Sequence, residues 1–133
     1  MSRRFSVSFP EGLLEELERV SESEGISRSA ALQRSAEMYI ASRKWMTAEG
    51  KIAGVTVIHY DHEAGGIEEK LTDIQHDFMD VIISALHIHL TKNECMLIIA
   101  VRGNSNRIRE FVDGISKLHG IKNSQFFPVA PLS

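Results

Sequence analysis

Disulfides, membrane-spanning runs and a secretory signal are all missing from this sequence. The chain has one cysteine among 133 residues, so it cannot form an internal disulfide. No apolar run approaches the roughly 18 residues that a membrane-spanning helix needs. The first residues lead into an alternating pattern and not into the continuous apolar core of a signal peptide. We therefore expect a cytoplasmic protein without a membrane partner, in which the thiol of Cys95 stays reduced and available as a metal ligand.

A large charge of one sign and internal repeats are also missing. The net charge of −3 argues against a protein that coats nucleic acid non-specifically, although it leaves room for a small basic reading element. Hydrophobic residues make up 43% and charged residues 25%, which is ordinary usage for a globular protein. A chain of 133 residues allows one domain, or two small ones that complete their cores by pairing with other copies. We expect an oligomer.

The N-terminal segment predicts one strand followed by two helices. Residues 4–9 alternate in polarity as a short strand does. Its two faces are an apolar one of Phe5, Val7 and Phe9 and a polar one of Arg4, Ser6 and Ser8. The first helix should run from Pro10 to a stop at Gly25, and Ser27 should cap a second that reaches residue 44 or 45. So few elements cannot bury their apolar faces alone, and the segment should dimerise through its strand.

The order of these elements resembles the ribbon-helix-helix fold of small bacterial repressors. In that fold the paired strands of two copies form a ribbon that lies in the major groove of DNA. The resemblance implies that Arg4, Ser6 and Ser8 contact base edges of a double-stranded operator, since arginine and serine both bond to bases there. Without the resemblance, the same polar face would be more typical of a strand that is exposed to solvent.

The segment around Gly50 predicts a hinge between two domains, residues 1–47 and 52–133. The six elements expected after it are a strand at 52–60, a helix at 67–78, strands at 81–90 and 95–102, a helix capped by Asn104 or Ser105 that ends at Gly120, and a strand at 121–127. This βαββαβ order is that of the split ferredoxin-like sandwich, so the fold class is α+β. A sheet that contains Val81, Ile83, Ile98 and Ile99 should expose apolar surface on the face without helices. Sheet-to-sheet or edge pairing between subunits, together with the paired N-terminal strands, should then give a dimer of dimers.

Two histidines and the only cysteine lie close together around one predicted hairpin. His87 and His89 share a strand face because side chains alternate with period two. A three-residue loop would pair Thr91 with Cys95 and put the thiol on that same face, whereas a two-residue loop would pair Thr91 with Glu94 and turn the thiol away. Two imidazoles and a thiolate suit zinc, copper or nickel. Strand histidines are also common as plain cross-strand partners, and a fourth ligand is missing.

His76 lies in the helix before the hairpin, half a turn away from the position of Ile67 on the apolar stripe. It should therefore point away from the core of its own subunit. Such a histidine is either a side chain exposed to solvent or a donor to a site on another subunit.

The spacing of His76, His87, His89 and Cys95 resembles the ligand set of the nickel-responsive NikR-family repressors, over essentially the whole chain. These proteins have an N-terminal ribbon-helix-helix domain and a C-terminal ACT-like ferredoxin domain. The resemblance implies one Ni²⁺ per subunit of a homotetramer, in a square plane to which His76 is donated by another subunit. It also implies that metal binding orders residues 65–78 and favours docking on the operator, with nickel uptake genes as the targets.

His62 matches a family position associated with secondary metal coordination, but other positions depart from the family. Ala30 and Arg34 stand where family members usually carry two acids that hold a second cation between the domains. Neither can bind a cation, although the charge of Arg34 could replace it by pairing with an acid across the interface. Ala64 and Gly65 replace the basic residues with which some relatives contact DNA phosphates.

No nucleophile with an adjacent base and no phosphate-binding glycine loop is visible, so we do not expect an enzyme. Two alternatives remain open at this stage. One is a ribbon-helix-helix regulator whose ACT-like domain senses another ligand, such as an amino acid. The other is a nickel-sequestering protein without a role at DNA.

Overall fold

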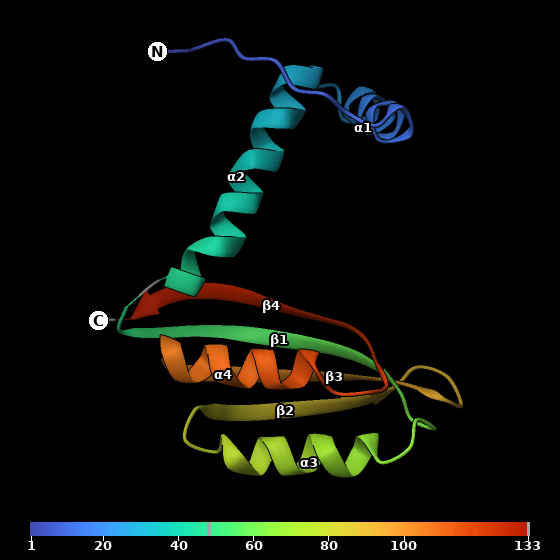
Figure 1. Ribbon diagram of the computed structural model, residues 1–133, viewed down its shortest axis with the longest axis vertical. Helices are drawn as coiled ribbons and strands as arrows, with labels where there is room; N and C mark the ends of the chain where they lie inside the picture. The colour runs from blue at the N-terminus through green and yellow to red at the C-terminus, as the bar shows by residue number, and fades with distance from the viewer. Residues whose placement is uncertain (48, 133) are drawn as a thin grey trace. The chain divides into compact units, whose positions relative to one another are not determined.

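The structure is a computed structural model that describes residues 1–47 and 49–132 (Figure 1). Its elements are α1 (Glu11–Glu24), α2 (Arg28–Thr47), β1 (Lys51–Asp61), α3 (Ile67–Asp77), β2 (Ile82–His89), β3 (Glu94–Asn104), α4 (Ser105–Ser116) and β4 (Ile121–Leu132). The chain divides into two compact units, Met1–Ala41 and Ser42–Ser133. The expected boundary between residues 47 and 52 stays a prediction. No helix among the described residues is long and apolar enough to cross a membrane.

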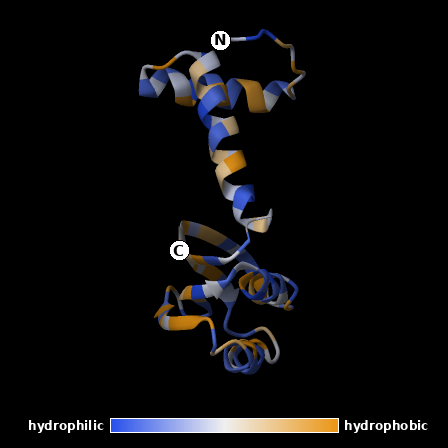
Figure 2. Ribbon diagram, turned by 90° about the vertical axis from the view of Figure 1, so that its left-hand side faces the viewer, coloured by the Kyte–Doolittle hydropathy of each residue, from blue (hydrophilic) through white to orange (hydrophobic). Residues whose placement is uncertain are grey.

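The N-terminal unit has the two expected helices but little core. α1 begins directly after Pro10 and ends at Gly25, whose φ of 70° is the left-handed conformation that favours glycine. The hydroxyl of Ser27 accepts a hydrogen bond from the backbone N–H of Ala30 (3.0 Å) and caps α2 as predicted. Ser21 and Ala31 are the buried residues described in this unit. Apolar residues are interspersed with polar ones along both helices (Figure 2), which leaves apolar surface without cover.

Residues 4–9 form no strand in the single chain. A strand needs hydrogen bonds to a neighbouring strand, and the expected neighbour is the same segment of a second copy. Two of the apolar side chains that we expect in the dimer core are exposed in the single chain, Phe5 at 84% and Val7 at 57% of their full surface. The ribbon-helix-helix assignment therefore stays a prediction.

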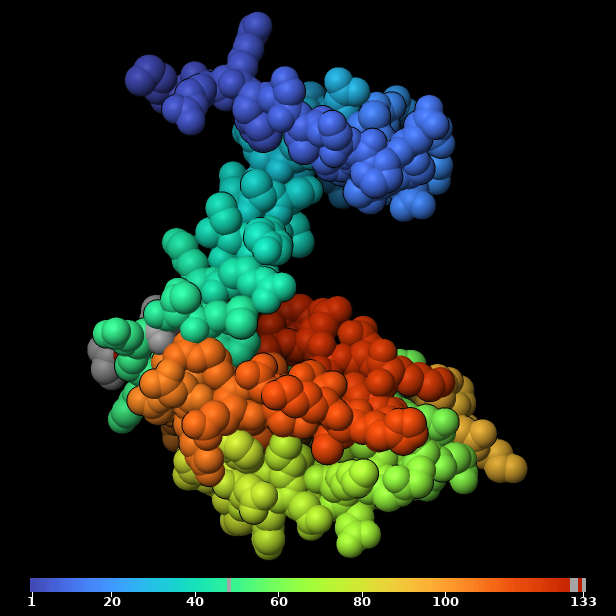
Figure 3. Space-filling model, in the orientation of Figure 1, coloured from blue at the N-terminus to red at the C-terminus, as the bar shows by residue number. Residues whose placement is uncertain are grey.

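The C-terminal unit is a four-stranded antiparallel sheet in the order β2-β3-β1-β4, with α3 and α4 on one face. These two helices lie side by side in the space-filling view (Figure 3). The side chains between sheet and helices alternate with exposed ones along β1 and β3, as period two requires. The predicted βαββαβ order is confirmed. The central core residues include Ile58, Ile67, Leu71, Ile99, Ile108, Phe111 and Ile115.

The last turn of α2 packs with the C-terminal unit. The ring of Trp45 lies 4.5 Å from that of Phe126, centroid to centroid. The guanidinium of Arg109 donates to the backbone carbonyls of Trp45 (3.1 Å) and Met46, two carbonyls at the helix end that lack partners within the helix. Residues 42–47 are therefore held by side chains of α4 and β4.

Two predicted element ends were wrong. α4 ends at Ser116 and not at Gly120, because the backbone leaves the helix in a turn closed by the Leu118 N–H and the Ile115 carbonyl (3.0 Å). β4 continues past Phe127 through Pro128 to Leu132. Proline is tolerated here because β4 is an edge strand and its pairing with β1 shifts register at this point.

The sheet face opposite the helices carries exposed apolar side chains, as expected. Ile99 belongs to the core because its strand position points toward the helices, and Val81 belongs to the core from the turn before β2. Strand alternation and register put Leu86 and Phe127 on the open face, and these are 56% and 50% exposed. This face is apolar surface that the single chain does not cover.

Candidate metal centre

The hairpin between β2 and β3 sets the face on which the thiol lies. Cys95 pairs directly with His89, and the loop contains residues 90–93. The predicted pairing of Thr91 with Cys95 is therefore wrong. Thr91 is folded into the turn, where its hydroxyl accepts from the Glu94 N–H (3.1 Å) and its own N–H donates to the Glu94 carbonyl (3.2 Å). The two registers differ by an even number of positions, so Cys95 still shares a face with both histidines, as predicted.

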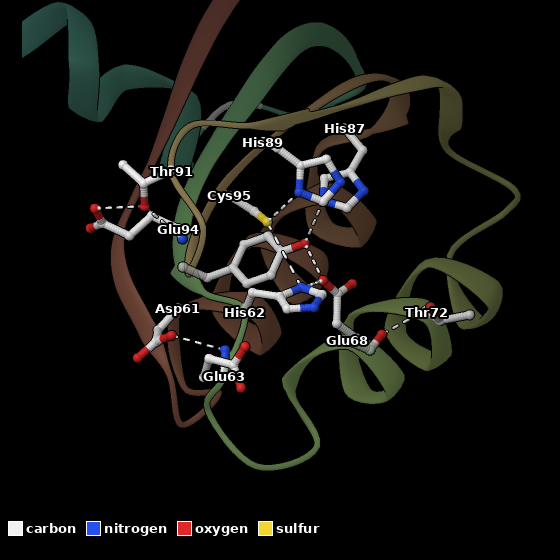
Figure 4. A network of polar contacts seen from close by, with 11 residues as sticks. Asp61, His62, Glu63, Glu68, Thr72, His87, His89, Thr91, Glu94 and Cys95 are labelled. Atoms are coloured by element: carbon white, nitrogen blue, oxygen red, sulfur yellow. Dashed lines mark hydrogen bonds and ion pairs between the residues drawn. The ribbon is translucent and has the colours of Figure 1, made fainter.

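Three donor atoms converge at this point. The ligand atoms of His87, His89 and Cys95 all lie within 4.8 Å of one another (Figure 4). The thiol is fully buried and both imidazoles are exposed, and 3.5 Å separates Cys95 Sγ from His89 Nδ1. Two nitrogens and one sulfur are donors that nickel, copper and zinc accept, so the side chains fit a transition-metal ion. A fourth position is left for a further ligand.

Tyr60 supports this cluster from the core strand β1. Its hydroxyl donates to Glu68 Oε1 (3.1 Å) and lies 3.0 Å from His87 Nε2. A hydroxyl has a single proton, and a carboxylate can only accept, so the tyrosine oxygen must accept from the N–H at His87 Nε2. A neutral His87 then keeps its lone pair on Nδ1, where it can bind a metal. Hydrogen bonds of this kind are the usual way in which proteins orient a metal-binding histidine.

The pKa of Tyr60 is raised well above its ordinary value of 10. Burial is the largest cause, and the hydrogen bond to Glu68 and the negative charge of that carboxylate add to it. The phenol therefore keeps its proton across the neutral range. Tyr60 acts here as a hydrogen-bonding group that orients His87, and not as a phenolate ligand.

His62 also lies beside the thiol, and its ring centroid is 6.2 Å from that of His89. Its Nδ1 is 2.6 Å from Glu68 Oε1 and 3.9 Å from Cys95 Sγ. Because the carboxylate only accepts, the N–H at Nδ1 donates to it. Glu68, in the first turn of α3, thus holds both Tyr60 and His62, and the ligand atoms of His62, Glu68 and Cys95 also lie within 4.8 Å of one another. His62 was expected from the sequence, whereas Glu68 was not.

The other predicted site residues lie outside this cluster. His76 is exposed in the last turn of α3, as its position on the helix predicted, and it belongs to neither ligand group that the described residues form. Arg4, Ser6 and Ser8 are all exposed. Their roles as ligand and as base-reading residues stay predictions.

Sequence reasoning missed Tyr60 and Glu68. Tyr60 could have been found from parity, since it lies two residues beyond Ile58 on the buried face of β1 and β1 pairs with the strand that carries Cys95. Glu68 had no comparable signal. It is one of two adjacent acids in the first turn of α3, where acidic residues are common for reasons of helix electrostatics alone.

The fold and the donor set define a small metal-binding α+β domain that follows a helical segment. Residues 53–128 match the family model described as the NikR C-terminal nickel-binding domain. A relative from Dictyoglomus turgidum is 42% identical over 122 residues, which cover 91% of this chain and 90% of that one. A relative from Methanocaldococcus jannaschii is 38% identical over 130 residues, which cover 96% and 92%. Both are named "Putative nickel-responsive regulator".

The chain belongs to the NikR family, a family of regulators and not of enzymes. A solved structure of an uncharacterized protein from Thermotoga maritima has a similar fold, with a TM-score of 0.55 and 10% identity over 60% of this chain and 99% of that one. That likeness concerns the fold alone.

Proposed function

We propose that this chain is a nickel-dependent DNA-binding repressor, with nickel uptake genes as its targets, that acts as a homotetramer in the cytoplasm. The observation that carries the proposal is the convergence of donor atoms from His87, His89 and Cys95 within 4.8 Å, in a chain with a nickel-binding family domain. The thiol is buried and the two imidazoles are exposed, so a metal ion can reach the site through the imidazoles while the sulfur stays shielded from water. Each subunit would supply three ligands to one Ni²⁺.

His76 of another subunit would supply the fourth ligand. Square-planar nitrogen and sulfur ligation suits nickel(II), whereas zinc prefers a tetrahedral site. His76 supports this role because it is exposed on α3, outside the cluster of its own chain. Once His76 is held by the hairpin of another subunit, residues 65–78 are fixed in one arrangement. This arrangement gains population only if it binds the metal more tightly than the alternatives do.

Two separate apolar surfaces support a tetramer built as a dimer of dimers. The N-terminal unit leaves Phe5 and Val7 exposed, and pairing two copies of residues 4–9 would cover them. The open face of the sheet leaves Leu86 and Phe127 exposed, and a second ACT-like domain packed against it would cover those. Different surfaces make different contacts, so both can form in one assembly.

The ribbon made by the first contact would present Arg4, Ser6 and Ser8 to the major groove of a two-fold operator. These three side chains are exposed and stand on the polar face of the alternating segment. The second cation of the family is not part of the proposal. Arg34 stands at one of the two positions where relatives carry an acid for that cation. Its Nη1 lies 3.8 Å from Glu24 Oε2 in an exposed ion pair, which contributes little to stability.

DNA binding with and without one equivalent of Ni²⁺ per subunit tests this function, with the DNA upstream of the chain's own gene as the probe. We expect nickel to raise the affinity, and His76→Ala and Cys95→Ala to remove that gain. His119→Ala is the matched control, because His119 is an exposed histidine outside both ligand groups. A nickel response that survives Cys95→Ala would overturn the site, and wild-type protein with no response would overturn the repressor.

A nickel-sequestering protein and a sensor of another ligand remain the competing functions. The first predicts that the protein does not bind this DNA with or without nickel. The second predicts DNA binding that neither nickel nor Cys95→Ala changes, so the same measurement separates all three.

A further inference from the structure

The thiol of Cys95 has a second group of ligand atoms beside it, in addition to His87 and His89. This group consists of His62 in the β1–α3 loop and Glu68 in the first turn of α3 (Figure 4). All of its members come from one chain. The two groups share the sulfur of Cys95, and each has its own imidazole nitrogens, but only the second contains a carboxylate.

One distance within the second group is close to that of a tetrahedral zinc site, and a second one is shorter. Ordinary zinc bond lengths put nitrogen and sulfur ligands about 3.6 Å apart, and nitrogen and oxygen ligands about 3.4 Å apart. His62 Nδ1 lies 3.9 Å from Cys95 Sγ, so this pair already has nearly the required separation. The 2.6 Å between His62 Nδ1 and Glu68 Oε1 is a hydrogen bond. A rotation of the exposed His62 ring can open that distance by the necessary amount.

We propose that His62, Glu68 and Cys95 form a second metal site within one chain, which takes zinc or another divalent cation that prefers tetrahedral nitrogen, oxygen and sulfur ligands. A water molecule completes the coordination, as in zinc sites with three protein ligands. Zinc binding displaces the proton that His62 Nδ1 shares with Glu68. In a neutral His62 that proton moves to Nε2, and the thiol proton is released to solvent, so one proton leaves per zinc bound.

The second site acts on metal selectivity because it shares the sulfur of Cys95 with the nickel site. This step rests on the proposed function, since it assumes that nickel uses His87, His89 and Cys95. While zinc holds the thiolate beside Glu68, the hairpin lacks its sulfur ligand and His76 of another subunit has no complete partner. Zinc would therefore bind without joining two subunits. Tetrahedral and square-planar ions are then sorted by the two ligand groups that share one sulfur.

Metal titrations of the full-length protein test this site, with Zn²⁺, Ni²⁺ and the spectroscopic substitute Co²⁺ as probes. We expect Glu68→Gln and His62→Ala to weaken zinc binding by at least about tenfold more than they weaken nickel binding. His89→Ala should do the reverse. Glu69→Gln is the matched control, because it makes the same change of charge one residue along α3 at an exposed position. Co²⁺ should give tetrahedral absorption with a thiolate charge-transfer band, and Glu68→Gln should abolish the tetrahedral bands.

Equal losses of zinc and nickel in both variants would mean a single site and would overturn the proposal. Zinc affinity in Glu68→Gln that matches Glu69→Gln would overturn it as well. The outcome is separate from that of the DNA titration. A zinc site with this ligand pattern stands even if nickel has no effect on DNA binding, and a nickel-dependent repressor stands even if Glu68 binds no metal.

Discussion

Replacing Tyr60 with phenylalanine removes one oxygen atom and keeps the ring. The side chain is 1% exposed, and its hydroxyl connects the core strand β1 to both Glu68 and His87. No cavity of ring size is created, so the cost of the substitution comes from the lost hydrogen bonds alone. Two effects are expected, one on stability and one on metal binding, and they have different sizes.

The stability effect should be small. A hydrogen bond to a charged group contributes about 1.5–3 kcal/mol, but the Glu68 side chain is 42% exposed and water can replace the lost donor. His87 is exposed too, so neither former partner is left buried and unsatisfied. We therefore expect a loss of about 0.5–1.5 kcal/mol in the free energy of unfolding. Urea titrations of the metal-free protein measure it, at one fixed protein concentration because the protein is expected to be an oligomer.

The effect of Tyr60→Phe on nickel affinity should be larger than its effect on the free energy of unfolding. Without the phenol oxygen, nothing on β1 accepts from His87 Nε2, so the ring is no longer held in the tautomer that leaves Nδ1 for the metal. Loss of such an orienting contact lowers metal affinity by roughly 10–100-fold. Competition against a chelator measures the change, with Tyr39→Phe as the control because Tyr39 lies in the other compact unit. A Tyr60→Phe protein with wild-type nickel affinity would refute the role assigned to this hydroxyl.

Three further predictions concern the scaffold. Asp80 accepts a hydrogen bond from Arg107 (3.1 Å), which lowers the pKa of the Asp80 carboxyl. The pair should therefore stabilise the fold at pH values above the unfolded pKa of about 3.9, and lose this effect as the pH falls through the lower folded pKa. The difference in melting temperature between wild type and Asp80→Asn should shrink on acidification. Leu86→Glu should reduce the assembly to a smaller oligomer in analytical ultracentrifugation, whereas Met79→Glu, an exposed change off the sheet, should not. Phe111→Ala should cost about 3–5 kcal/mol in urea titrations, since this ring is fully buried.

The periodicity of the sequence was enough to predict most of the C-terminal unit. Its apolar stripes and alternating strands are local patterns, and period two alone put His87 and His89 on one face. The loop length of the hairpin was harder, because the hydroxyl of Thr91 bonds inside the turn and ends the pairing early. The prediction that Cys95 shares a face with the two histidines was still correct, because the observed register differs from the predicted one by an even number of residues.

The parts that could not be predicted depend on contacts between distant segments. Nothing near Glu68 in the sequence indicates that it meets Tyr60 and His62, because this contact exists only once α3 lies against the sheet. Residues 4–9 show a different limit. Their alternating pattern is clear, but the strand that it predicts would form its hydrogen bonds with a second copy, so a single chain contains no structure that tests the prediction.

In the two proposals above, Cys95 is the residue that would decide which metal this chain binds. The thiol is fully buried, and its two groups of neighbours come from β2 and from the β1–α3 loop with the first turn of α3. Neither group has a second sulfur, and each lacks its strongest donor when the other holds the thiolate. If both proposals hold, nickel and zinc compete for one sulfur and do not fill independent sites. Raising the zinc concentration should then lower nickel occupancy even in protein whose His87 and His89 are intact, and Glu68→Gln should relieve that competition.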